Sequence, residues 1–222
     1  MIGPSFQYSA LCELVGGRAG TGPIWVAWDT NVLSLYEEYG ESMWDEEEIV
    51  VQRADPVEVR ALGTLVAIWM WWDLRFMVLE LTESDSKKAR QPSDIQRREI
   101  SMNGLAAALS LGLDGVGTRP ESRQALDPEL LDCLPKGHDR RLVHQAHAVG
   151  ADVFLTTDKG ILKRDIDLTK FGLRCLKPTQ LVNSLVEAGV PLGWAPTSLG
   201  GLAPDLGRMS ALIAALEQNS DR

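Results

Sequence analysis

Short apolar runs alternate along the chain with longer segments of helical spacing. The runs at 23–28, 74–81, 151–158 and 172–178 are rich in aliphatic and β-branched residues, a pattern typical of strands buried on both faces. Apolar residues recur every three or four positions over 32–40, 57–72, 95–113 and 140–150, and another helix is expected to begin at Pro178. This alternation predicts an α/β sandwich around a mainly parallel sheet.

Two segments fall outside this regular alternation. Residues 114–137 are rich in glycine, proline and charge, which indicates an insertion or a long loop. After residue 190 the chain reads as a linker, and 208–218 carries a short amphipathic pattern. We therefore predict one domain over 1–190 and a C-terminal linker with a short helix over 191–222. That helix either docks on its own domain or binds a partner.

Composition narrows the class of protein. Apolar residues make up 45% of the 222 residues, enough for a substantial core, and the net charge of −9 argues against a broad basic surface for nucleic acid. A local basic groove remains compatible with that charge. Three widely separated cysteines predict reduced thiols, and the most apolar segment, 62–74, is too short to span a bilayer. With no signal-peptide pattern at the N-terminus, we expect a cytoplasmic protein that does not enter a membrane.

Three aspartates fall where strands end or where a helix leads into a strand. Asp29 follows the strand predicted at 23–28, and Asp158 closes the one at 151–158. Asp139 stands at the start of the helix at 140–150, which leads into that second strand. Parallel α/β sheets bind ligands beyond the carboxyl ends of their strands, so these carboxylates are expected at one edge. Helix capping by Asp29 is the simpler explanation for that residue. Gathered carboxylates repel one another unless a cation lies between them, and hard oxygen ligands suit Mg²⁺ or Mn²⁺.

At this point the chain resembles a known family. The stretches AWDTNVL, GHDRRLVHQAHAVGADVFLTTDKGIL and LRCLKPTQLVNSL are similar to the motifs of PIN domains, the fold of VapC-type toxin ribonucleases. The resemblance covers residues 23–185. It implies a three-layer α/β/α sandwich with a central, mainly parallel sheet. It also implies a Mg²⁺- or Mn²⁺-dependent endoribonuclease that cleaves RNA, with an antitoxin protein and a second copy of the chain as further partners to consider.

The resemblance also implies residue roles. Asp29, Asp139 and Asp158 would bind the metal. Asp85 would be the fourth acid, with Glu83 and then Glu80 as rivals, and Glu80 is expected within the second strand. Asn31 would hold Asp29 and Thr156 would orient a ligand or the substrate phosphate. The side chains that would neutralise RNA phosphates, unless they are ordinary surface charges, are Arg140, Arg141, Lys159 and Lys163.

Other functions fit the residues less well. His138, His144 and His147 lack a fourth ligand for zinc and are expected to be packing or surface residues. No glycine-rich phosphate loop follows a strand. Two alternatives remain open: another phosphoryl-transfer enzyme built on an acid cluster, and a catalytically weak PIN-like module that binds protein.

Overall fold

The structure is a computed structural model of the chain. It describes residues 14, 24–44, 50–52, 54–68, 74–86, 95, 132–134 and 137–188, without the side chains of Trp44, Glu83, Asp85 and Ser86. Most of the predicted helix at 95–113, most of the 114–137 segment and the whole tail beyond 190 lie outside the described residues. The domain boundaries predicted from sequence therefore stay predictions.

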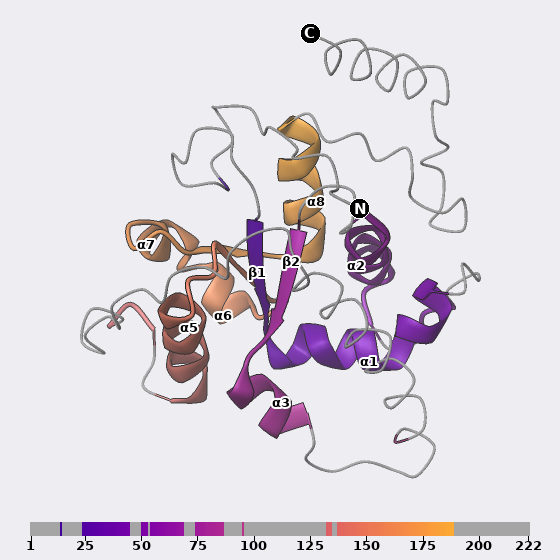
Figure 1. The fold of residues 1–222 in the computed structure, drawn as a ribbon, viewed down its shortest axis with the longest axis horizontal. Helices are drawn as coiled ribbons and strands as arrows, with labels where there is room; N and C mark the ends of the chain where they lie inside the picture. Colours follow the sequence, from indigo (N-terminus) through magenta and orange to yellow (C-terminus); the bar gives the residue numbers. More distant parts are fainter. Residues whose placement is uncertain are drawn as a thin grey trace, which may run out of the picture.

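The described strands form one four-stranded sheet. Strands β1 (Ile24–Trp28), β2 (Leu74–Val78), β3 (Val153–Leu155) and β4 (Arg174–Leu176) lie in the order β2-β1-β3-β4. Every pairing is parallel, with Trp28 opposite Val78 on one side and Leu155 on the other. Figure 1 shows β1 and β2 side by side, pointing toward the end of the sheet where α1 and α3 begin. The predicted parallel α/β sheet is thereby confirmed.

Helices cover both faces of this sheet. Alternate residues of β1, among them Val26 and Trp28, pack against α1 (Thr30–Trp44), α2 (Pro56–Ile68) and α8 (Pro178–Glu187). Ala27 and its neighbours Phe154 and Cys175 point the other way, toward α5 (His138–Ala148), α6 (Lys159–Leu162) and α7 (Asp165–Thr169). Because successive strand residues face opposite sides, β1 must be apolar throughout, and all five of its residues are buried.

Several predicted boundaries are wrong. The second strand ends at Val78 rather than at 81, and α3 (Glu80–Ser86) begins there, so Glu80 lies in a helix and not in the strand. An apolar run cannot by itself separate a strand from the start of a helix. Gly40 does not end α1, which continues to Trp44 with Met43 buried in the core. Burial there outweighs the cost of about 1 kcal/mol for glycine inside a helix. The strands predicted at 151–158 and 172–178 are also shorter in the structure, since β3 ends at Leu155 and β4 at Leu176.

Two other predicted helix ends agree with the structure. Gly150 has a positive φ of 81° directly after α5, as expected of a residue that terminates a helix. Helix α8 begins at Pro178, and the buried carboxylate of Glu58 on α2 accepts hydrogen bonds from the amide and hydroxyl of Thr179 at 3.1 and 2.8 Å. Within the described part of the chain, no helix is long and apolar enough to cross a membrane.

Candidate active site

The strand order creates a topological switch point at the carboxyl edge of the sheet. From β1 the chain first moves to β2 on one side, and later returns to β3 on the other side. The connections after β1 and β3 therefore diverge, which is the position where open parallel sheets bind ligands. Asp29 follows β1 directly, and Thr156, Thr157 and Asp158 follow β3. The amide of Asp29 donates to the carbonyl of Leu155 at 2.9 Å, which fixes the two strand ends to each other.

Asp29 lies at the centre of a dense hydrogen-bond network. Its side chain is buried, with 5% of the residue exposed. Oδ1 accepts from the amide of Thr30 at 2.7 Å, and Oδ2 accepts from Asn31 Nδ2 at 2.7 Å and Thr156 Oγ1 at 2.5 Å. The Asp29 carbonyl also accepts from Leu33, the first intrahelical bond of α1. Capping and site formation are thus two roles of the same residue.

The side chains of Asn31 and Thr156 link the segment after β1 to the segment after β3. The Asn31 side chain donates to Asp29 and, at 3.4 Å, to Thr156 Oγ1, while its Oδ1 accepts from the amide of Thr157 at 3.1 Å. The amide of Asp158 in turn donates to Thr156 Oγ1 at 3.0 Å. The structure therefore brings Asn31 and Thr156 to Asp29, as the sequence predicted for Asn31. These bonds restrict the Asp29 carboxylate to one rotamer. The predicted role of Thr156 toward a ligand or the substrate phosphate stays a prediction.

Burial and neighbouring negative charge both act on Asp29. Burial raises the pKa of Asp29 above its ordinary value of 3.8, and the hydrogen bonds from Thr156 and Thr30 partly oppose this rise. The negative charges of Asp139 and Asp158 raise the pKa further. All three predicted metal ligands are therefore close enough to interact electrostatically. A cation bound among them would relieve this repulsion.

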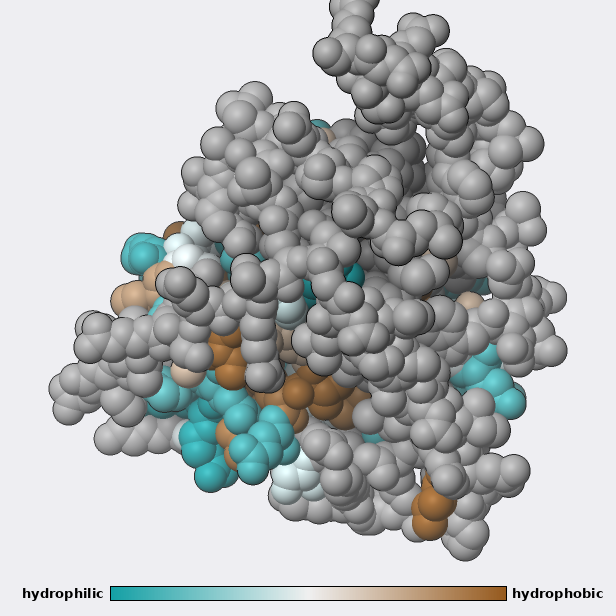
Figure 2. Space-filling model, viewed as in Figure 1, coloured by the Kyte–Doolittle hydropathy of each residue, from teal (hydrophilic) through white to brown (hydrophobic). Residues whose placement is uncertain are grey.

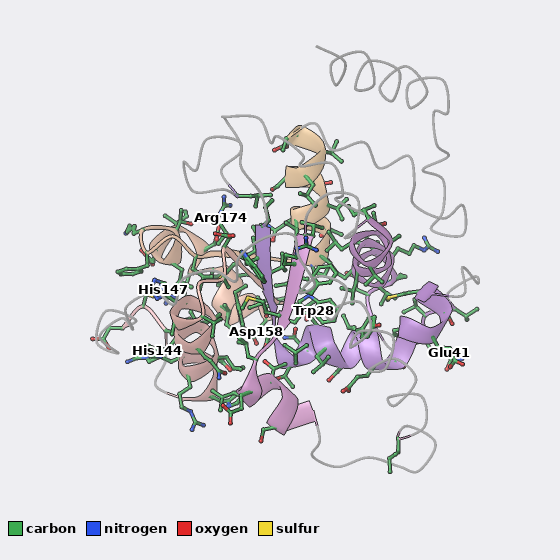
Figure 3. All side chains as sticks on the ribbon, viewed as in Figure 1. Trp28, Glu41, His144, His147, Asp158 and Arg174 are labelled. Carbon is green, nitrogen blue, oxygen red and sulfur yellow. The ribbon has the colours of Figure 1, made fainter. Side chains whose placement is uncertain are left out.

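The outer two carboxylates are held less tightly than Asp29. Asp158 is exposed, and its Oδ1 accepts from the amides of Gly160 and Ile161 at 2.6 and 3.1 Å, which caps α6. Asp139 is exposed in the first turn of α5. Figure 3 shows Asp158 near the lower ends of the strands, beside the start of α1. Carboxylate oxygens are the donors that Mg²⁺ and Mn²⁺ prefer, so the chemistry of the set fits these ions.

The three carboxylates have suitable chemistry for a divalent ion, but in the structure they lie too far apart to bind one ion together. Among the residues that the structure describes, no three acid, histidine or cysteine side chains are gathered tightly enough to hold one metal ion. The three predicted ligands thus interact electrostatically without forming a compact ligand set among the described residues, and metal binding by them stays a prediction.

The second acid was predicted from sequence at Asp85, Glu83 or Glu80. All three belong to α3, which starts at the carboxyl end of β2. The side chains of Asp85 and Glu83 lie outside the described residues. Glu80 is exposed and lines a groove together with Arg140 and Arg141. The structure therefore corrects the strand placement of Glu80 and leaves the choice among the three acids as a prediction.

The basic residues divide into one structural side chain and several exposed ones. Arg140 donates to Asp132 Oδ1 at 2.9 Å and through two nitrogens to the Leu134 carbonyl, so it anchors residues 132–134 to α5. Arg141, Lys159 and Lys163 are exposed. Arg140 is accordingly a poor choice for binding phosphate, whereas Arg141 and Lys159 are accessible for it.

A groove separates α3 from α5 beside this edge of the sheet. It has a volume of about 580 Å³ and is lined on one side by Glu80, Leu81 and Ser84. The α5 side includes Arg141, Gln145 and Ala148. Figure 2 shows hydrophilic side chains gathered around the lower end of α5. The Leu81 amide of α3 donates to Gln145 Oε1 of α5 at 3.3 Å. No local sequence pattern predicts this groove, because the two helices are about 60 positions apart in the chain.

The described cysteines and His147 do not suggest another chemistry. Cys133 and Cys175 are free thiols, and burial together with the charge of Asp165 raises the pKa of Cys175, so its thiol stays protonated. His147 is buried on α5 with Nε2 3.2 Å from the carbonyl of Phe171.

No protein-family model, no curated protein and no solved structure matches this sequence.

Gly160 offers a way to move one carboxylate of the site. A Cβ at this position would lie 2.9 Å from Asp158 Oδ1, so Gly160→Ala is expected to push that carboxylate off its cap. Losing the cap costs about 1 kcal/mol, while alanine in place of glycine recovers a similar amount. We expect a thermal midpoint within about 2 °C of wild type and a weaker stabilisation by Mn²⁺, both measurable by thermal unfolding. Wild-type stabilisation by Mn²⁺ in this variant would show that the Asp158 position is irrelevant to the ion.

Proposed function

We propose that this protein is a Mg²⁺- or Mn²⁺-dependent endoribonuclease with a PIN-like fold. The observation that carries the proposal is the buried Asp29 at the switch point of a parallel sheet, with the charges of Asp139 and Asp158 acting on it. The three-layer arrangement and the braced Asp29-Thr30-Asn31 and Thr156-Thr157-Asp158 segments support it. Asp29, Asp139 and Asp158 would hold the ion, which supplies Lewis-acid activation of a phosphodiester and its attacking water.

The residues around Asp29 would hold its carboxylate in position and bind the RNA strand. Asn31 and Thr156 hold the Asp29 carboxylate in place, so no rotamer entropy is lost when it acts. Burial of Asp29 keeps bulk water away from one side of the site and strengthens electrostatic interactions there. Arg141 and Lys159 are exposed and would bind phosphate oxygens of the strand.

A cleavage assay tests this proposal. Purified protein is incubated with labelled single-stranded and structured RNA in Mg²⁺, in Mn²⁺ and in EDTA. We expect internal cleavage that requires the ion and falls at least about tenfold in Asp158→Asn. Glu187→Gln, which removes an exposed charge at the end of α8, is the matched control and should cleave as wild type does. Activity that persists in EDTA, or survives Asp158→Asn unchanged, would refute the mechanism.

Ion binding should also be visible as a pH-dependent gain in stability. Because the pKa of Asp29 is raised, its ionised form is a cost to the folded state at neutral pH, and this cost disappears as pH falls through the raised pKa. A cation binds only the ionised form, so its stabilising effect is expected above the raised pKa of Asp29 and should fade as the pH falls through that pKa. At 100 times the dissociation constant it would contribute about 2.7 kcal/mol. Thermal unfolding with and without Mn²⁺ over a series of pH values measures this; an equal shift at every pH would contradict it.

One observation favours the alternative of a catalytically weak module that binds protein. The described side chains do not form a compact set of three metal ligands. As such a module, the protein would bind Mn²⁺ weakly and leave RNA intact. The cleavage assay and the thermal shift together distinguish the two functions, since the module should give neither signal.

A further inference from the structure

The groove between α3 and α5 opens beside the candidate active site. Helix α3 is fixed to the end of β1, because the buried hydroxyl of Thr82 donates to the carbonyl of Trp28 at 3.0 Å. Helix α5 carries Asp139, whose charge acts on Asp29. Both walls are therefore attached to the same edge of the sheet as the acids. None of the three acids lines the groove itself, so the groove would take a neighbouring nucleotide of a strand whose phosphate lies at those acids.

The lining of the groove suits a nucleobase better than a run of phosphates. Its volume of about 580 Å³ lies within the range of small-ligand sites. Leu81 and Ala148 offer aliphatic surface for a flat ring, while the Glu80 carboxylate would repel a phosphate. The Arg140 charge in the lining is already balanced by Asp132. Among the described residues of the lining, Arg141 is the one exposed arginine or lysine. A single cation can bind the phosphate of one nucleotide but not a run of phosphates.

Besides Ser84 and His144, which can both donate and accept hydrogen bonds, the polar lining contains Glu80 and Gln145, and these two define a preference. An ionised carboxylate such as Glu80 only accepts hydrogen bonds. Gln145 Oε1 accepts from the Leu81 amide, which leaves the Gln145 Nε2 group as a donor. Guanine matches this pair, because its Watson–Crick edge places two N–H donors next to a carbonyl acceptor. Such an edge is exposed only when the base is unpaired.

We propose that the α3–α5 groove is a subsite for one unpaired guanine of the RNA strand, next to the phosphate held at the acids. The inference rests on the proposed ribonuclease function and names its substrate recognition. Glu80 accepts from the guanine edge, Gln145 donates to its carbonyl, and Arg141 binds the adjoining phosphate. Cleavage would accordingly occur next to guanines in single-stranded regions.

Binding without cleavage tests the groove separately from the chemistry. Wild-type protein in EDTA is titrated into fluorescent single-stranded RNA hexamers that differ only in one central base, and anisotropy gives the dissociation constants. The guanine hexamer should bind about tenfold more tightly than the uracil hexamer. Glu80→Gln should remove most of that preference, and Glu187→Gln should keep it. Equal affinity for all four hexamers would overturn the guanine assignment.

A steric block provides a second, independent measurement. Ser84→Trp fills the groove from an exposed position of α3, and Ser34→Trp makes the same substitution at an exposed position of α1. Only Ser84→Trp should weaken hexamer binding, by about tenfold or more. Competition with guanosine monophosphate and with a duplex of the same sequence completes the test, and both should compete at least about tenfold less well than the hexamer. A mononucleotide that competes equally would indicate a free-nucleotide site instead, and a duplex that competes equally would exclude an unpaired base.

The outcomes separate the two proposals. If RNA is cleaved with an ion but Ser84→Trp and Glu80→Gln leave binding and cleavage positions unchanged, the groove inference fails and the ribonuclease stands. If hexamers bind with the expected preference but no ion supports cleavage, the groove stands as a binding site and the catalytic proposal fails.

Discussion

Replacing Asp29 by asparagine is expected to reduce RNA cleavage by at least about 100-fold, the scale of losing a central electrostatic group. The substitution keeps the size of the side chain but removes the charge that a divalent ion requires at the centre of the site. Stability should change by only about 1 kcal/mol, because the buried charge is no longer a cost while one accepted hydrogen bond is lost. Single-turnover cleavage rates and urea unfolding measure the two effects.

The comparison with Asp29→Ala sharpens this result. Alanine leaves the donors of Thr30, Asn31 and Thr156 without their acceptor, so it should lose both activity and about 3 kcal/mol of stability. A matched loss of activity in both variants with a stability loss only in alanine would assign the charge to catalysis and the hydrogen bonds to folding. Asp29→Asn that cleaves within a few-fold of wild type would refute the assigned role.

Trp28→Ala is expected to give the largest loss of stability, about 3–5 kcal/mol. Trp28 is fully buried at the end of β1, and its ring lies 5.2 Å from that of Tyr36 and 5.0 Å from that of Phe76, measured between centroids. Truncation would leave a cavity between β1, β2 and α1, and would remove two aromatic contacts. The free energy of unfolding from urea denaturation measures this loss. For a domain with a typical stability of roughly 5–15 kcal/mol, a large share of the total would be lost.

Two further variants control this prediction. Trp28→Phe keeps an aromatic ring in the core and removes an indole N–H that has no hydrogen-bond partner among the described residues, so it should cost less than about 2 kcal/mol. Val186→Ala changes an exposed position of α8 and should stay within about 0.5 kcal/mol of wild type. A cost below about 1 kcal/mol for Trp28→Ala would show that the core packs differently around β1.

Much of the architecture could be predicted because burial leaves a direct trace in the residue pattern. A central parallel strand is apolar on both faces, and IWVAW shows this without ambiguity. The end of α5 at Gly150 and the start of α8 at Pro178 follow from backbone preferences of single residues. The end of β2 could not be predicted, because contacts of Leu81 and Thr82 with distant residues turn an apolar run into the start of a helix.

In the candidate site, too, some features follow from the sequence alone and others from the tertiary structure. The sequence alone determined that Asp29 and Asp158 follow apolar strands and that Asn31 and Thr156 accompany them, since these are properties of consecutive residues. Tertiary structure decided that β1 lies between β2 and β3, so that Asp29 meets Thr156 over a separation of 127 positions. It also decided that Arg140 holds residues 132–134 and that α3 and α5 enclose a groove. The physical reason is that hydrogen bonds and charges act through space, whereas a residue pattern records only each segment's own burial and backbone preference.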